Sequence, residues 1–256
     1  MKRSLLKITR ICGLIWLLIT TNVYANMNNK LPEDFVFLSG IDSSIIENVR
    51  YSGDQNFLGR PVDGYKVNKV VCTKQAAEKL KKANDDFKKQ GYIIVVYDGY
   101  RSSISTDDFT KWGEDINDDV AKSYYYPTYE KKELFKLGYI AAEYSTHTRG
   151  STFDLTLIKA DEHLKPIVFS KRKLNNGEEI PFLDDNTVDM GSSFDLFHLV
   201  SRPDSKLVSE EQNRMRKFLQ DTMAQYGFKV HDEEWWHFTL QNEPYPDTYF
   251  DFVVEG

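Results

Sequence analysis

Two short stretches of the sequence combine residue types that could bind one metal ion. In the first, His147 and Asp154 stand seven positions apart on either side of Gly150. In the second, about eighty residues further on, Glu234 and His237 flank a pair of tryptophans. A catalytic zinc ion usually takes three protein ligands from His, Asp, Glu and Cys and keeps a fourth position open. The spacing therefore suggests a metal centre that the fold assembles from both stretches.

If the two stretches meet, their residues divide into ligands and reacting groups. His147, Asp154 and His237 would form a three-ligand zinc site, and the ion would lower the pKa of a water in the open position to roughly 7. Glu234 would stand beside that water as a general base. This requires a helical or bent backbone, because an i,i+3 pair points apart on a flat strand. Arg101 is the candidate cation for the oxyanion of a tetrahedral intermediate, since its charge does not depend on pH.

Each histidine also has an ordinary interpretation, as a surface or core residue with a satisfied hydrogen bond. Short His and acid patterns recur by chance, so the metal centre stays a hypothesis at this point. We keep the ordinary interpretation for His163 and His231, which lie in charged surroundings, and leave His198 open. His147 and His237 differ because each has a carboxylate at a short offset and lies beside apolar or aromatic residues.

The first 25 residues have the features of a secretory signal peptide. Four basic residues among the first ten precede an apolar run over residues 11–19, and Ala25 supplies a small residue for cleavage. A membrane anchor would need about 20 apolar residues, roughly twice this run. We therefore expect a protein that is exported to the periplasm and keeps no stable membrane anchor after cleavage.

Composition limits the class of protein further. The 25 residues carry four basic and no acidic side chains, so their removal changes the formal charge from −6 to −10, and nucleic acid is not an expected partner. About 230 residues rich in Tyr, Phe and Trp remain, which is enough for one sizeable core without a second domain. Cys72 would be the one remaining cysteine, so the mature chain cannot form an internal disulfide.

The segments before the first stretch predict a helix and a buried strand. Residues 74–90 carry an apolar stripe at helical spacing, and Thr73 precedes them as a suitable N-cap. Residues 92–97 form a β-branched and aromatic run, which is typical of a strand buried on both faces. Arg101 follows just after this strand, where it could project into a site. A surface ion pair is the commoner environment of an arginine.

Further elements are expected around the histidine stretch. A second helix is predicted to open at Ser105, with Asp108 at the capping-box position. A short helix over residues 130–136 would lead to His147. Residues 155–158 would form a strand directly after Asp154. Asp154 and Thr156 would then share the face toward the site, while Leu155 and Leu157 would enter the core.

The rest of the chain completes an α+β domain. Residues 26–48 are interpreted as an N-terminal arm, and residues 49–256 as the domain itself. Residues 159–187 are interpreted as an inserted flap, because Asn176-Gly177 between apolar residues predicts a hairpin. A helix is predicted over residues 210–226. Without a regular βαβ alternation, we expect a single α+β domain with a small, mainly antiparallel sheet flanked by helices.

Six motifs follow one another along nearly the whole mature chain. They are Arg60-Pro61-Val62-Asp63-Gly64-Tyr65; Asp98-Gly99-Tyr100-Arg101; Ser145, His147, Arg149-Gly150 and Asp154-Leu155-Thr156-Leu157; Met190-Gly191-Ser192 with Phe194-Asp195; Glu234-Trp235-Trp236-His237; and Glu243-Pro244-Tyr245-Pro246 with Tyr249-Phe250-Asp251-Phe252. In this order they resemble the motifs of the D-alanyl-D-alanine dipeptidases, the VanX-type zinc enzymes of the hedgehog/DD-peptidase fold group. Together they are highly specific, although each alone would be weak.

The resemblance implies a role for each matching position. It implies that one zinc ion is held by His147, Asp154 and His237, that Glu234 is the base and proton shuttle, and that Arg101 stabilises the tetrahedral intermediate. It further implies that Ser145, Asp195 and Tyr51 receive the free ammonium of a small dipeptide. A substrate without a free ammonium would leave the Asp195 carboxylate buried and unpaired. This cost would disfavour binding of the wrong substrate.

The sequence departs from the family at two places, and other functions stay open. Ser102 stands where the family usually has a proline after its arginine, and the flap at 159–187 is longer than the usual connection. The expected activity is zinc-dependent hydrolysis of D-Ala-D-Ala or a related D-containing dipeptide in cell-wall peptide turnover. The alternatives are a carboxypeptidase or endopeptidase acting on peptidoglycan stem peptides, and a non-catalytic zinc-binding domain that recognises cell-wall peptides. The oligomeric state cannot be inferred from these residues.

Overall fold

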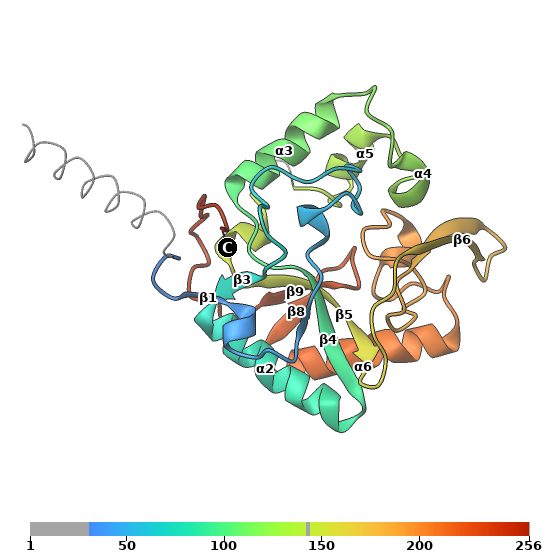
Figure 1. Ribbon diagram of the computed structural model, residues 1–256. Helices are drawn as coiled ribbons and strands as arrows, with labels where there is room; N and C mark the ends of the chain where they lie inside the picture. Colours follow the sequence, from blue (N-terminus) through green and yellow to red (C-terminus); the bar gives the residue numbers. More distant parts are fainter. Residues whose placement is uncertain (1–30, 142–143, 256) are drawn as a thin grey trace, which may run out of the picture.

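A computed structural model describes residues 31–141 and 144–255 and has a central sheet between two groups of helices (Figure 1). The predicted signal peptide lies outside the described residues. Within the described ranges, no helix has the length and apolar character needed to cross a membrane.

The central sheet has five strands in the spatial order β2-β4-β5-β9-β8. β2 runs parallel to β4, and every other neighbouring pair is antiparallel. The expected α+β domain with a mainly antiparallel sheet is thus confirmed. In the same order, the strands span Ile46–Glu47, Tyr92–Asp98, Thr152–Lys159, His237–Leu240 and Phe228–Val230.

Two smaller strand pairs lie beside this sheet. β1 (Phe35–Phe37) pairs with β3 (Val71–Thr73), and β6 (Val168–Lys173) pairs with β7 (Glu179–Asp184), both antiparallel. β1 and β2 both fall within residues 31–48, so the described part of the predicted arm contributes strands to two sheets. The β6–β7 hairpin falls within the predicted flap and projects away from the central sheet (Figure 1).

Helices cover the sheet from opposite sides (Figure 1). α2 (Lys74–Lys89) and α6 (Glu210–Gln225) lie together on one side, where α2 contacts β4 and α6 contacts β8. The other group consists of α3 (Ser103–Glu114), α4 (Lys122–Tyr125) and α5 (Lys131–Lys136). Four short 3-10 helices connect these elements: η1 (Leu38–Gly40), η2 (Arg50–Ser52), η3 (Thr146–Arg149) and η4 (Leu199–Ser201).

The two long helices begin and end where local chemistry predicts. The Thr73 hydroxyl accepts a hydrogen bond from the Ala76 N–H at the start of α2. At the start of α6, Ser209 and Gln212 form a reciprocal capping box. Both helices begin at the predicted residue and end one residue before the predicted boundary. The two predictions are confirmed.

The predicted start of the next helix is wrong. Ser102, not Ser105, is the N-cap of α3, because its hydroxyl accepts from the Ser105 N–H at 3.3 Å. Asp108 does not close a capping box. Its carboxylate receives two 2.8 Å bonds from the Arg60 guanidinium and one from the Asp63 N–H. Ser102 therefore anchors the backbone immediately after Arg101, at the position where the resembled family usually has a proline.

β5 is more deeply buried than its sequence suggests. Its residues from Thr152 to Ile158 are all buried, because β4 and β9 pair with its two edges and helices cover the sheet. Leu155 and Leu157 enter the core as predicted. Thr156 is fully buried too, so only Asp154 of the predicted site-facing pair reaches the cavity described below.

Candidate metal centre and active site

His147 projects from η3, the turn that precedes β5. The hydroxyl of Ser145 caps this turn by accepting from the His147 N–H, and Gly150, with φ +81°, lets the chain leave it and enter β5. The imidazole Nδ1 lies 2.8 Å from the Gly99 carbonyl oxygen, beyond the end of β4. Because a carbonyl can only accept, Nδ1 carries the proton and the lone pair of Nε2 faces the cavity.

Asp154 and His237 are brought together by strand pairing. Asp154 on β5 is the direct register partner of His237, the first residue of β9. The chain between Glu234 and His237 is a turn, closed by a bond from the His237 N–H to the Glu234 carbonyl. The predicted bend is therefore present, and it brings both side chains of the i,i+3 pair to the same cavity.

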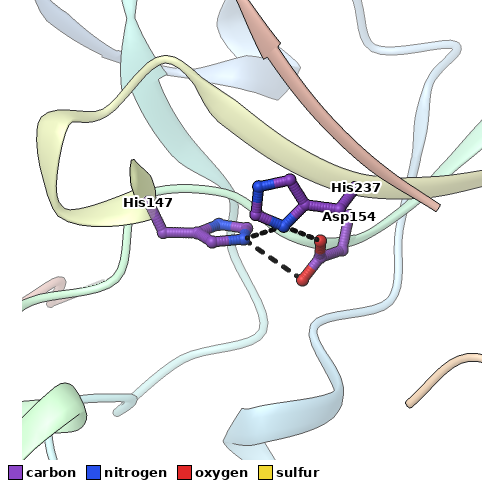
Figure 2. Close-up of side chains that lie close together, drawn as sticks. All are labelled: His147, Asp154 and His237. Atoms are coloured by element: carbon purple, nitrogen blue, oxygen red, sulfur yellow. Dashed lines mark hydrogen bonds and ion pairs between the residues drawn. The ribbon is translucent and has the colours of Figure 1, made fainter. Parts of the chain in front are cut away.

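The three predicted ligand side chains converge on one point (Figure 2). His147 Nε2 lies 3.3 Å from both His237 Nδ1 and Asp154 Oδ2, and His237 Nδ1 lies 3.2 Å from Asp154 Oδ1. Ligand atoms about 2.0–2.1 Å from a tetrahedral zinc ion lie about 3.3–3.4 Å from one another. The spacing of these atoms thus fits zinc.

The hydrogen bonding and ionisation of these side chains also suit a cation. Asp154 Oδ1 is buried and accepts no hydrogen bond within the described chain. Burial lowers the pKa of His237 to about 4, so its imidazole is neutral near pH 7. Burial alone would raise the pKa of Asp154, but His147 and His237 hold it below its ordinary value. Asp154 and the two imidazoles therefore direct their oxygen and nitrogen atoms to one point, as the ligands of a divalent metal do.

Two residues that were given no role from the sequence lie where they can orient the candidate ligands. Thr146 Oγ1 lies 3.1 Å from His237 Nε2, so it can accept a hydrogen bond from the Nε2 N–H and leave the Nδ1 lone pair free. Asp98 is fully buried, and its Oδ2 lies 3.5 Å from His147 Nδ1. Such outer contacts fix the tautomer and orientation of metal-binding histidines. The available sequence signal for Asp98 was an acidic residue directly after a buried strand.

Arg101 is held rigidly at the same cavity. Its Nε and one terminal nitrogen donate to Asp98 Oδ2 at 3.0 and 2.9 Å. The guanidinium carbon lies 5.0 Å from the ring centre of Tyr51 and 4.8 Å from that of Phe109. Burial lowers the pKa of Arg101, but the charge of Asp98 outweighs it and the pKa lies well above its ordinary value. Arg101 is therefore positively charged in the cavity.

Glu234 stands beside the ligand set. Its Oε2 lies 3.5 Å from His237 Nδ1, and its side chain is buried. Burial, followed by the charges of Asp154 and Asp195, raises the pKa of Glu234 well above its ordinary value. A carboxyl with a raised pKa next to a metal centre can both accept and donate a proton.

A second carboxyl lines the same cavity. Tyr51 donates from its hydroxyl to Asp195 Oδ2 at 2.8 Å, and both residues are buried. Burial and the charge of Asp154 raise the pKa of Asp195 well above its ordinary range. Within the described residues, no basic side chain forms an ion pair with Asp195. The Asp195 carboxyl therefore has no cationic partner there, and a positively charged group of a ligand could take that place.

One cavity of about 160 Å³ contains all eight residues proposed for the site. Its remaining lining is mostly aromatic and includes Phe57, Tyr139 and Phe197. None of the lining residues comes from the predicted flap. The eight residues are Tyr51, Arg101, Ser145, His147, Asp154, Asp195, Glu234 and His237.

The structure also places two of the three remaining histidines. His231, interpreted above as an ordinary residue, lines the cavity with its ring centre 5.1 Å from that of His237. Its Nδ1 accepts from the Glu233 N–H, so it does have a satisfied hydrogen bond. His198 is buried away from the cavity and contacts Glu178. The charged residues around it in the sequence, Lys229, Asp232 and Glu233, gave no sign that His231 would reach the site.

A buried His-Asp-His set with metal-ligand spacing, beside a carboxyl and an arginine, defines a metallopeptidase-type site on this α+β fold. A family model described as D-ala-D-ala dipeptidase, in the peptidase family M15, matches residues 32–168 and 182–255. The chain belongs to this family and is a metallopeptidase. The match skips residues 169–181, which form the outer part of the β6–β7 hairpin.

Three relatives agree with the family match. A D-alanyl-D-alanine dipeptidase of Enterococcus faecalis (strain ATCC 700802 / V583) is 36% identical over 224 residues, which cover 88% of this chain and 100% of the relative. Enzymes of the same name from Enterococcus faecium and Streptomyces coelicolor are each 35% identical over 221 residues, covering 86% of this chain and 98% of each relative.

Proposed function

We propose that the chain uses one zinc ion to hydrolyse D-alanyl-D-alanine, or a closely related D-containing dipeptide, to free amino acids. The observation that carries the proposal is a single small cavity that combines a zinc-compatible ligand set, two further carboxyls and a fixed guanidinium. The names of three relatives that align over almost their whole length support the choice of substrate.

The ligand set and Glu234 would share the chemistry of bond cleavage. His147, Asp154 and His237 would hold the ion, which when bound supplies a water of lowered pKa and polarises the substrate carbonyl. Glu234 accepts a proton from the attacking water and delivers it to the leaving amine. Its Oε2 lies 3.5 Å from His237 Nδ1, so the carboxyl stands close enough to the ligand set for both steps.

Arg101 would stabilise the negative charge that develops on the carbonyl oxygen. Asp98 and the two flanking rings hold the guanidinium in place before the substrate arrives. A charge that is already oriented costs no reorganisation at the moment of reaction. Arg101 therefore contributes more to the transition state than to ground-state binding.

Tyr51, Ser145 and Asp195, here called the ammonium site, would receive the free amino terminus of the dipeptide. An ammonium supplies the cation that Asp195 lacks. An acylated stem peptide would instead place an amide against this buried carboxyl, which would be left without compensation. The volume of about 160 Å³ also lies below the roughly 300–1,000 Å³ of pockets that take drug-sized ligands. Both features favour a free dipeptide over a cell-wall stem peptide.

We also propose that the protein acts after export, in the periplasm, where it would recover D-Ala from cell-wall peptide turnover. The support is the basic and apolar pattern of the first 25 residues. Export of the protein with its N-terminal segment fused to a periplasm-dependent reporter would test this location.

Turnover by the purified protein tests the activity. With zinc bound, D-Ala-D-Ala should release D-Ala, whereas N-acetyl-D-Ala-D-Ala should be a much poorer substrate. Absence of turnover at full metal occupancy would contradict the dipeptidase proposal. Preference for the acetylated peptide would instead indicate a stem-peptide peptidase.

A further inference from the structure

The β6–β7 hairpin does not line the active-site cavity and touches only segments outside or beside it. The family match skips residues 169–181 within it, and the described cavity lining includes none of its residues. In the part of the chain that the structure describes, β6 and β7 pair with each other and with no other strand. An influence of this hairpin on catalysis must therefore pass through the segments against which it packs.

The turn end of the hairpin packs on the loop that carries Asp195. Leu174 and Ile180 are buried in the same small hydrophobic cluster as Leu196, the residue next to Asp195, and this cluster is separate from the main core. Val200 and Val208 complete this small core. Leu196 and Asp195 thus lie on two sides of one loop, with the first residue held by the hairpin and the second directed into the cavity.

Hydrogen bonds reinforce this packing. The Asn175 N–H donates to the Leu207 carbonyl at 3.0 Å, and its side-chain amide donates to the Val208 carbonyl at 2.7 Å. The imidazole of His198 lies 3.1 Å from a carboxylate oxygen of Glu178 at the hairpin turn. The hairpin is therefore attached along the segment that follows Asp195.

The residues before Asp195 are held as well. The Leu183 N–H of β7 donates to the Ser193 hydroxyl at 2.7 Å. Asp195 itself has a φ of +59°, a left-handed conformation that is uncommon for residues other than glycine. Such a conformation persists where the surrounding structure enforces it. Hairpin contacts at Ser193 and Leu196 enclose the strained residue from both sides.

The base of the hairpin reaches the other half of the ammonium site. Asp185, just after β7, accepts from the Arg50 guanidinium at 2.5 Å and from the Tyr97 hydroxyl at 2.7 Å. Arg50 precedes Tyr51 in the short helix η2. The buried ion pair thus connects the end of the hairpin to the backbone that carries Tyr51, whose hydroxyl donates to Asp195.

We propose that the β6–β7 hairpin is a positioning element that holds the Tyr51–Asp195 pair in the geometry needed to receive the substrate ammonium. The inference rests on the proposed dipeptidase function for its catalytic consequence. Its structural part, the support of the Asp195 loop, does not depend on the substrate. The residues that exert the effect are Leu174, Ile180, Leu183 and Asp185.

The test removes one hairpin contact without touching the cavity. Ile180→Ala should raise KM for D-Ala-D-Ala about tenfold and reduce the preference over N-acetyl-D-Ala-D-Ala by a similar factor, because the receptor carboxyl is misplaced. The zinc content and kcat should change little. Ile180→Val, which keeps most of the packing, should restore the wild-type values. Lys171→Ala, on the exposed side of the hairpin, is the matched control.

Hydrogen exchange gives a readout that does not need activity. In Ile180→Ala, the backbone amides of residues 193–198 should exchange at least about tenfold faster, while those of β5 remain protected. Unchanged exchange in a folded variant would overturn the proposal. So would faster exchange with unchanged KM and unchanged substrate preference, because the hairpin would then only stabilise the loop.

The same measurements separate this inference from the proposed function. If the wild-type protein hydrolyses no dipeptide, the dipeptidase proposal fails, and the exchange rates still decide whether the hairpin holds the Asp195 loop. If Ile180→Ala does not fold, Asn175→Ala takes its place, because Asn175 is exposed and loses only its side-chain bonds to the Lys206 and Val208 carbonyls.

Discussion

The metal centre and the ammonium site lie in one cavity but are built by different kinds of structure. Asp154 and His237 are register partners on neighbouring strands, and His147 sits in the turn that enters one of those strands. Tyr51 and Asp195 come from a short 3-10 helix and a loop, and 144 positions separate them in the sequence. Strand pairing sets the ligand positions directly, whereas the ammonium site depends on packing between irregular segments.

The two sites should respond differently to amino-acid substitutions. Residues on paired central strands are held by backbone hydrogen bonds on both sides, so single substitutions nearby leave their spacing intact. Loops tolerate insertions and carry much of the variation in binding specificity. We therefore expect substitutions around the metal centre to affect all chemistry, and substitutions around the ammonium site to affect substrate choice.

The largest expected effect is the loss of a ligand. His237→Ala should abolish zinc binding and lower kcat/KM by at least about 10³-fold, because the remaining two side chains cannot form a catalytic zinc site. Metal analysis after dialysis and steady-state kinetics provide the measurement. Retention of stoichiometric zinc would show that these three residues are not the ligand set.

Glu234→Gln is the matched control for the ligand variant, since it changes a neighbouring side chain in the same turn without changing its size. It should keep the metal and lose about 10²–10⁴-fold in kcat, the usual contribution of a general acid or base. The contrast between the two variants separates metal binding from proton transfer. A fully active Glu234→Gln protein would assign the proton transfer to another group.

A smaller and more selective effect is expected at the ammonium site. Asp195→Asn removes the charge while keeping the bond from Tyr51, and the loss of a buried charge partner costs about 2–5 kcal/mol, so KM should rise roughly 30-fold or more. Zinc content should stay at the wild-type level. An equal loss for the free and the N-acetylated dipeptide would contradict the proposed separation between the two sites.

The smallest effect concerns the sheet side of the molecule, away from the cavity. Burial opposes the ionisation of Asp42, but bonds from Ser44 and Asn84 outweigh it and lower its pKa to about 2. Since the folded pKa lies below the ordinary value of 3.8, Asp42 stabilises the fold above about pH 4, and this contribution disappears as the pH falls toward 2.

Urea unfolding of the wild type and of Asp42→Asn at pH 6 and pH 3 measures this contribution. The variant should be less stable at pH 6, and the difference between the two proteins should shrink at pH 3. The Asn84 side chain joins α2 to the Ile94 N–H of β4, so the effect reports on the sheet and not on the ammonium site. A difference that does not change with pH would contradict the role of the Asp42 charge.

Local patterns predicted the regular elements of the fold well. The apolar stripe of α2, its Thr73 cap and the buried strand β4 are each set by neighbours in the chain, and all were confirmed. The start of α3 was predicted wrongly because two serines three positions apart could each cap a helix. In the structure Ser102 is the cap, and Asp108 pairs with Arg60, 48 positions away, instead of closing a capping box.

The sequence by itself determined the residue types of the metal centre and the spacing that suits zinc, because His147, Asp154, Glu234 and His237 lie in two compact stretches. Only the tertiary structure decided that Asp98 supports both Arg101 and His147, that His231 lines the cavity, and that the hairpin supports Asp195. The physical reason is the range of the interactions. Caps, turns and strand patterns act between near neighbours, whereas the cavity is formed by contacts between segments separated by tens to more than a hundred positions.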